Sequence, residues 1–189
     1  MKTSKTQLFS GLSMGLLTAV IVIMTSCEAK SQQKTKVEAP AMDFHTAAMT
    51  GNVDAVKQHI AAGSDLSAKD PFGGSSPLIS AIVFDKTEAA KVLIDAGSDL
   101  KFKNNDGSTP LHVATFFCRT EIVKMLLAKG ADKTLKNNYG STPIEIVIAP
   151  WDVMKPIYEM QQASLGGFGL ELDLGRIEKT RPAIADLLK

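Results

Sequence analysis

The sequence is poor in the residues that usually build disulfide frameworks, metal sites and catalytic centres. Its 189 residues include only two cysteines, Cys27 and Cys118, and only three histidines. Two cysteines so far apart form neither a disulfide framework nor a pair of zinc ligands. The sequence also lacks the spacing of a Ser-His-Asp triad, a phosphate-binding loop and a dinucleotide-binding turn. We therefore expect a protein without enzymatic activity, cofactor or metal.

Neither sign of charge is in excess. The chain has 21 Lys and Arg residues against 20 Asp and Glu residues, which gives a net charge of +1. Domains that bind nucleic acid usually carry a clear basic excess. We therefore expect no nucleic-acid partner. Because 44% of the residues are hydrophobic, the chain can form a packed core.

The first residues have the order of an export signal. Lys2 and Lys5 precede an uncharged, mainly apolar run over residues 8–24, and small residues follow it. A basic start, an apolar run and small residues are typical of a secretory signal peptide. The sequence therefore predicts that the rest of the chain faces a compartment outside the cytoplasm.

The end of this apolar run carries a second motif. Cys27 follows Thr25 and Ser26 directly, which resembles a bacterial lipobox, although Met24 stands where leucine is usual. The resemblance implies cleavage before Cys27 and a lipid such as palmitate on this cysteine. An ordinary signal peptide or an uncleaved anchor is the alternative.

These motifs divide the N-terminal part of the chain. Residues 1–26 are predicted to be the signal peptide, and residues 27–42, which are polar and show no periodicity, a flexible tether. We expect a lipid-anchored protein of the bacterial cell envelope, facing the periplasm or the cell surface. The residues do not distinguish the inner from the outer membrane.

The stretch from Asp106 to Asp132 predicts two short helices and the turns around them. Asp106-Gly107 is a turn dipeptide, and Thr109 can cap a helix that begins with Pro110. Residues 121–129 carry apolar residues at helical spacing, and Gly130 supplies a left-handed exit. Neither helix can bury its apolar face alone, so the unit needs similar neighbours.

Such neighbours recur at a fixed distance along the chain. Pro77, Pro110 and Pro143 each follow Ser or Thr, and both 110 − 77 and 143 − 110 equal 33. The segments 96–99 and 129–132 repeat with the same period. A fixed period of this length indicates a repeat architecture.

The residues of this unit resemble the ankyrin repeat. The resemblance rests on GSTPLH at residues 107–112, on the EIVKMLLAKGAD run at residues 121–132 and on the period of 33, and it covers about residues 43–149. It implies an all-α solenoid of helix pairs joined by β-turn fingers. The expected domain spans residues 43–189, with repeats at about 43–70, 71–104, 105–137 and 138–189.

The fourth repeat begins in register and is then interrupted. Pro150 ends its first helix, and a helix that ends in Leu187-Leu188 appears only later, which places an insertion at about residues 151–178. We expect an added helix over residues 152–163, a loop over residues 166–169, and a closing helix that begins at Pro182. An unrelated C-terminal extension is the alternative.

The resemblance also implies where partners bind, because ankyrin stacks bind proteins with their finger tips and with the exposed ends of their first helices. Several of the corresponding residues are large and apolar, which suggests anchors for a partner. The alternative is that Phe84 and Phe117 pack into neighbouring repeats and that the insertion at Trp151 covers part of this concave face. The ten positions are Met49, Phe72, Val83, Phe84, Asn105, Asp106, Phe116, Phe117, Asn138 and Tyr139.

The same resemblance gives the histidines structural roles. His45 and His112 share one repeat position, where the family uses the side chain to brace neighbouring turns, and His59 is expected at the surface. Cys118 is expected at a sharp turn between helices, either as an inert thiol or in a redox or intermolecular role.

These patterns together predict a non-enzymatic interaction module, monomeric and tethered to a membrane, that binds a protein through its concave face and fingers. An immunity-like inhibitor of a toxic enzyme is an alternative use of the same face. An enzyme or small-molecule binder that uses the insertion between Trp151 and Asp173 is the competing class.

Overall fold

The computed structural model describes residues 37–189, and these residues form helices and loops without a β-strand. The predicted signal peptide, Cys27 and most of the predicted tether lie outside the described residues. Within residues 37–189, none of the helices has both the length and the apolar character needed to cross a membrane.

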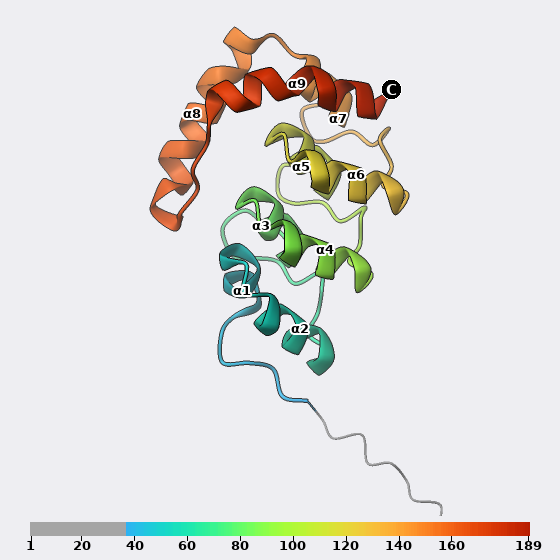
Figure 1. Ribbon diagram of the computed structural model, residues 1–189, viewed down its shortest axis with the longest axis vertical. Coiled ribbons are helices and arrows are strands. Elements are labelled where there is room, and N and C mark those ends of the chain that lie inside the picture. Colours follow the sequence, from blue (N-terminus) through green and yellow to red (C-terminus); the bar gives the residue numbers. More distant parts are fainter. Residues whose placement is uncertain (1–36) are drawn as a thin grey trace, which may run out of the picture. The chain divides into compact units, whose positions relative to one another are not determined.

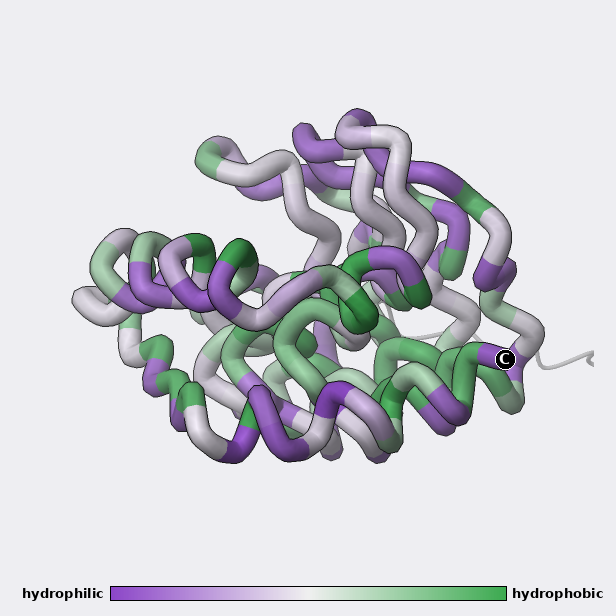
Figure 2. The backbone as a smooth tube through the Cα atoms, turned by 90° about the horizontal axis from the view of Figure 1, so that it is seen from above, coloured by the Kyte–Doolittle hydropathy of each residue, from purple (hydrophilic) through white to green (hydrophobic). Residues whose placement is uncertain are grey.

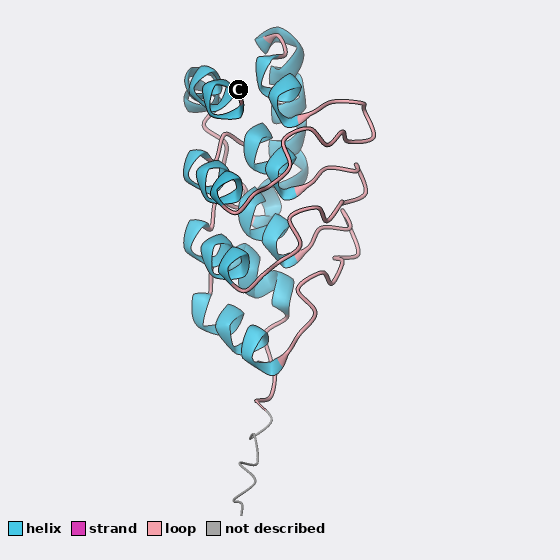
Figure 3. Cartoon of the chain, turned by 90° about the vertical axis from the view of Figure 1, so that its right-hand side faces the viewer, coloured by secondary structure: helices cyan, strands magenta, loops and turns pink. Residues whose placement is uncertain are grey.

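The helices are arranged in four layers of two (Figures 1 and 3). In each layer a short inner helix runs into a tight turn and then into an outer helix, and each helix packs against its counterparts in the adjacent layers. The inner helices are α1 (Phe44–Thr50), α3 (Pro77–Val83), α5 (Pro110–Phe116) and α7 (Pro143–Ile148). The outer helices are α2 (Val53–Ala62), α4 (Thr87–Asp95), α6 (Thr120–Ala128) and α9 (Leu174–Leu188).

The predicted signals set the ends of these helices. Pro77, Pro110 and Pro143 each occupy the first turn of an inner helix, where the missing N–H costs no hydrogen bond. Thr109 and Thr142 form capping boxes with the residue three positions later. The turn to the outer helix needs a left-handed residue, which is Gly51 in the first layer and Asp85 and Cys118 in the next two.

Small side chains let the layers approach one another. Ala47, Ala81 and Ala114 stand at one repeat position, and each is completely buried on its inner helix. The leucines Leu78 and Leu111 and the outer-helix residues Leu93 and Leu126 are also completely buried and fill the space around them. Seen from above, the hydrophobic stretches gather where the helices pack, and the projecting loops are mostly hydrophilic (Figure 2). Stacking therefore buries the apolar surface that a single helix pair would leave exposed.

The fourth layer contains extra structure between its two helices. After α7, helix α8 (Trp151–Leu165) and the 3₁₀ turn η1 (Gly166–Phe168) form a hairpin that leads back to α9. Helix α9 packs against α6 and α7, as α6 packs against α4 and α5. It therefore holds in the last layer the position that an outer helix holds in the others.

The predicted start of this closing helix at Pro182 is wrong. The helix begins at Leu174, where the carboxylate of Asp173 accepts a hydrogen bond from the Arg176 N–H, and Pro182 lies inside it. The Asp173 cap supplies a start signal seven residues before Thr180, and the tertiary contacts of α9 support the helix through the proline.

The expected surface position of His59 is also wrong. His59 is only 6% exposed, and its ring stacks on Phe44 with 4.4 Å between centroids. Its nitrogens are 2.8 Å from the Met42 carbonyl and 3.0 Å from the Ser64 hydroxyl. Because these partners lie before and after α1 and α2, His59 ties the ends of the first layer together.

Candidate protein-interaction face

Three finger loops, residues 70–75, 104–108 and 137–141, project on one side of the helices (Figure 3). An Asp or Asn at the base of each loop holds its backbone. The Asp70 carboxylate accepts from the N–H groups of Phe72, Gly73 and Ser75 at 2.6–2.8 Å. The side-chain oxygens of Asn104 and Asn137 accept two N–H groups each in the same way. The fingers are therefore shaped before any partner arrives.

The charge state of Asp70 fits this role. Burial alone would raise the pKa of its carboxyl, but the N–H donors outweigh this effect and hold the pKa below its ordinary value of 3.8. The carboxylate is therefore ionised at neutral pH and keeps the first finger in shape.

Neighbouring fingers are joined in register. The Asn105 N–H donates to the Gly73 carbonyl at 3.0 Å, and the Asn138 N–H donates to the Asp106 carbonyl at 2.9 Å. The Asn138 side-chain amide also donates to the Asn105 carbonyl at 3.0 Å. The three fingers thus form one continuous row.

The five finger residues predicted to contact a partner are all exposed. Phe72 and Tyr139 are the two most exposed large apolar side chains among the described residues, at 84% and 76%. The Tyr139 hydroxyl donates to the Asp106 carboxylate at 3.2 Å, which orients the ring along the finger row. Asn105 and Asn138 lie beside them with exposed side chains.

The five predicted helix positions differ from one another. Met49, Val83, Phe84 and Phe116 are half-buried, whereas Phe117 is only 4% exposed. The prediction that Phe117 faces a partner is wrong, because it lies edge-on to Phe116 in the core with the Arg119 guanidinium over its ring. For Phe117 the alternative interpretation holds.

Helix α8 covers part of the surface predicted for a partner. Tyr158 is completely buried, lies 4.5 Å from Phe116 between ring centroids, and donates its hydroxyl to the Phe116 carbonyl at 2.7 Å. Trp151 packs on Tyr158, and Arg181 reaches the Tyr158 hydroxyl while its guanidinium lies over the Trp151 ring. The insertion is therefore fixed against the end of α5.

The opposite side of α8 presents apolar residues that the sequence did not single out. Val153, Ile157 and Met160 share one side of the helix and are 56%, 36% and 57% exposed. Beyond the helix, Phe168 is 58% exposed and lies 6.3 Å from Phe72 between ring centroids. Helical spacing could have revealed the first three residues, but the Phe72–Phe168 contact joins distant parts of the chain and has no local signal.

Two histidines brace neighbouring repeats, as the resemblance implied. His112 contacts the Thr109 hydroxyl at 2.8 Å and the Ser141 carbonyl of the next finger at 3.1 Å. His45 lies 3.3 Å from the Ser80 hydroxyl in the next layer. Burial lowers the pKa of His112, although carbonyls at Ser141 and Leu135 oppose the shift, so the ring is neutral at pH 7. Both side chains act in the stack rather than in catalysis.

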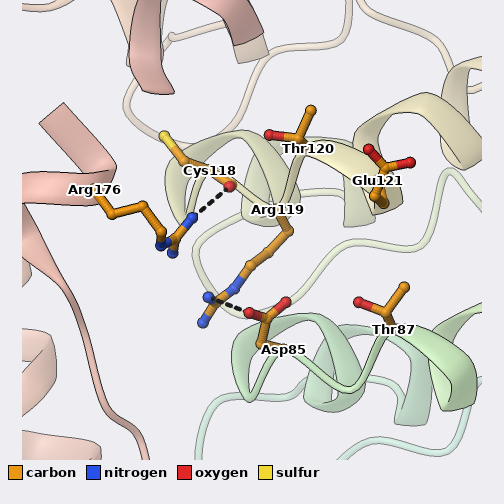
Figure 4. A pocket seen from close by; sticks show the side chains of 7 residues that line it. All are labelled: Asp85, Thr87, Cys118, Arg119, Thr120, Glu121 and Arg176. Atoms are coloured by element: carbon orange, nitrogen blue, oxygen red, sulfur yellow. Dashed lines mark hydrogen bonds and ion pairs between the residues drawn. The ribbon is translucent and has the colours of Figure 1, made fainter. Parts of the chain in front are cut away.

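A small open depression at the ends of α3 and α5 contains the polar groups that come closest to a reactive site (Figure 4). Arg119 is 5% exposed and donates to the Asp85 carboxylate and to the Val83 carbonyl, both at 2.9 Å. Arg176 donates to the Cys118 carbonyl at 3.2 Å. These guanidinium groups saturate helix-terminal carbonyls, which is a structural role.

Cys118 lines the same depression and is 1% exposed. Burial raises the pKa of its thiol to about 11, although nearby arginines oppose the shift. The thiolate needed for nucleophilic or redox chemistry is therefore disfavoured at neutral pH. Residues 37–189 also contain no group of three His, Cys, Asp or Glu side chains arranged to hold a metal ion.

Comparison with known protein families agrees with the layered architecture. Residues 44–137, which form the first three layers, match the family described as ankyrin repeats in three copies. No curated protein matches the chain. The match, the period of 33 and the bonded fingers coincide on the same residues, and the chain therefore belongs to the ankyrin-repeat family.

Proposed function

We propose that this chain is a membrane-tethered binding module that holds a protein partner outside the cytoplasm. Ankyrin repeats indicate a protein–protein interaction module, and the family is generally non-enzymatic. The tether, the compartment and the binding residues are our inference. The interaction face consists of the three fingers, the half-buried ends of α1, α3 and α5, and the exposed side of α8.

The observation that carries this proposal is the position of exposed aromatic side chains on preformed loops. Phe72 and Tyr139 are 84% and 76% exposed, and their fingers are already held in shape by hydrogen bonds from backbone N–H groups to the side chains of Asp70 and Asn137. Phe168 approaches Phe72 from the insertion. Exposed aromatic residues on rigid supports lose little conformational entropy on binding and are common anchors in protein interfaces.

The interaction face can be tested by capture of the partner from intact membranes. Cross-linking and pull-down should recover a specific protein with the wild type, and Phe72→Ala combined with Phe168→Ala should reduce recovery at least about tenfold, because two exposed aromatic anchors are lost. Leu187→Ala, which removes an exposed leucine from α9, is the matched control and should leave recovery unchanged. Equal recovery with the double variant, in a protein with an unchanged melting curve, would refute the proposal.

The tether has its own test. Metabolic labelling with palmitate should mark the wild type and not Cys27→Ala, and the variant should leave the membrane fraction. The sequence motif around Cys27 supports this expectation. Labelling that persists in the variant would contradict a lipid on this cysteine while leaving the interaction face untouched.

A further inference from the structure

The row of fingers ends in an edge at which the backbone carbonyls of Asn138 and Tyr139 have no hydrogen-bond partner among residues 37–189. In each internal joint, a carbonyl of one finger accepts the N–H of an asparagine in the next, at Gly73 and then at Asp106. The equivalent third carbonyl belongs to Tyr139, because 106 − 73 and 139 − 106 both equal 33. No fourth finger follows it, since the chain continues into α7 and α8.

The joint between the second and third fingers shows what such an edge accepts. Asn138 donates its main-chain N–H to the Asp106 carbonyl and its side-chain amide to the Asn105 carbonyl, at 2.9 Å and 3.0 Å. One asparagine thus bonds two consecutive carbonyls. The carbonyls one repeat further along, which are equivalent to those of Asn105 and Asp106, belong to Asn138 and Tyr139. Both of these residues are exposed.

The glycines of the fingers show that the space for this asparagine is present and empty. A Cβ atom added to Gly74 would meet the Asn105 side chain at 2.2 Å, and one added to Gly107 would meet the Asn138 side chain at 2.3 Å. Each of these glycines therefore leaves room for the asparagine of the next finger. Gly140 stands at the same repeat position with a positive φ of 77°, and no described atom lies within 4 Å of an added Cβ.

We propose that the edge formed by Asn138, Tyr139 and Gly140 binds a segment of the protein partner that carries an asparagine. The partner's asparagine donates its main-chain N–H to the Tyr139 carbonyl and its side-chain amide to the Asn138 carbonyl, and it packs on Gly140. This is strand addition at an exposed edge, with a side-chain requirement set by the glycine. The inference deepens the proposed function and rests on it.

A second copy of this chain does not supply the matching group. The finger asparagines Asn105 and Asn138 already donate within the row. The first finger carries Phe72 at the corresponding position, and its N–H is bonded to the Asp70 carboxylate at 2.8 Å. No finger of the described chain thus offers a free asparagine, which favours a different protein as the occupant.

The test uses a peptide with the sequence of the third finger, residues 134–142, as a probe for the unidentified partner. Added to ¹³C-labelled full-length protein in detergent micelles, it should shift the carbonyl signals of Asn138 and Tyr139. A peptide with aspartate in place of the second asparagine of the Asn-Asn pair cannot donate from its side chain. It should bind about tenfold more weakly, which is the effect of one lost hydrogen bond between neutral groups.

Two glycine variants decide whether the space beside Gly140 is the site. Gly140→Ala should abolish the peptide-induced shifts, because its Cβ fills the position of the asparagine. Gly130→Ala is the matched control, since Gly130 has a φ of 80° and equally open surroundings at the end of α6, and it should bind the peptide like the wild type.

Several outcomes would overturn the proposal. Equal binding of the two peptides, or unchanged peptide binding to Gly140→Ala, would do so. Peptide-induced shifts confined to residues other than Asn138 and Tyr139 would do so as well. The same shifts on concentrating the protein without peptide would mean that a second copy fills the edge. If the peptide fails while Phe72→Ala with Phe168→Ala still loses the partner, the interaction face stands and only the edge is refuted. If the peptide binds at the edge while Phe72→Ala with Phe168→Ala still recovers the partner, the proposed interaction face is refuted and the peptide-binding edge is not.

Discussion

At the scale of single residues, the stack depends on polar side chains that cap inner helices from a neighbouring element. The C-terminal carbonyls of a helix have no partner within the helix. Arg119 satisfies the Val83 carbonyl of α3, Tyr158 the Phe116 carbonyl of α5, and Arg181 the Ala149 carbonyl after α7. Each cap comes from a later part of the chain, and the caps from Arg119 and Tyr158 join different layers as well as closing one helix.

Replacing Arg119 by methionine should therefore lower the free energy of unfolding. The change removes two hydrogen bonds that the buried guanidinium donates to Asp85 and to the Val83 carbonyl. We expect a loss of about 2 kcal/mol, which is moderated because the half-exposed Asp85 carboxylate can bind water instead. Urea unfolding followed by circular dichroism measures it. Lys124→Met breaks only the exposed pair with Glu121 and should change stability by less than about 0.5 kcal/mol. Equal effects of the two substitutions would contradict the capping role.

Cys118 should be unreactive in the folded protein. Its thiol is buried, and the raised pKa of about 11 leaves almost no thiolate at pH 8. In a Cys27→Ser background, an aromatic disulfide that reacts with free thiols should label Cys118 slowly in buffer and rapidly in urea. Labelling at the same rate in both conditions would support the redox or intermolecular role instead.

At the scale of elements, α8 and α9 each contain an internal proline, Pro156 and Pro182. An internal proline removes one helical hydrogen bond and crowds the preceding turn. Both helices persist because side chains such as Tyr158 and Ile184 are completely buried against the stack. Packing thus overrides a local signal that, read alone, placed the start of α9 too late.

Pro182→Ala should stabilise the protein. Pro182 is exposed, so alanine loses no packing, restores an N–H to the helix and removes the ring. The greater freedom of the unfolded chain offsets part of this gain, and we expect a net increase of about 1–2 kcal/mol in the free energy of unfolding. Thermal unfolding measures it. Pro150→Ala, at the N-cap of α8, offers no comparable gain and serves as the control. A decrease with Pro182→Ala would show that the proline fixes a bend that the stack needs.

At the scale of the whole molecule, each layer is stable mainly through its neighbours, so a contact between layers affects the complete stack. His112 is such a contact, because it lies on α5 and bonds the Ser141 carbonyl in the third finger. Its buried ring has a pKa below the ordinary value of 6.5. The unfolded chain therefore binds a proton at this histidine more readily than the folded chain does.

The stability of the stack should accordingly decrease as the pH falls below the ordinary histidine pKa of 6.5. The contribution of His112 is fully present above pH 6.5 and is lost as the pH falls, with a limiting slope of about 1.4 kcal/mol per pH unit for one proton. His112→Gln keeps a side chain that can complete the capping box with Thr109 but does not titrate, so it should flatten this dependence. Asp70 and Glu145, whose pKa values lie below 3.8 and 4.5, act only in more acidic solution. An unchanged pH profile in the variant would exclude His112 as the source.

The sequence alone determined the layers and their inner surfaces. Three of the four periods carry a proline start, the first three carry a left-handed exit, and helical apolar spacing recurs from layer to layer. These are local signals that need no knowledge of the other layers. The exposed fingers at Phe72 and Tyr139 followed from the same register. The repeat therefore predicted most of the fold and half of the candidate site.

Only the tertiary structure decided the rest, because it depends on contacts between distant residues. Phe116 and Phe117 are identical neighbours, but one lies half-buried under Tyr158 and the other points into the core. The approach of Phe168 to Phe72 joins residues that no local pattern relates. Gly107 and Gly140 stand in the same short motif, Gly-Ser-Thr-Pro, and differ only in that a further finger packs on the first and none on the second. Where a repeat ends is a property of the neighbours around it, so the open edge became visible only once the layers were in place.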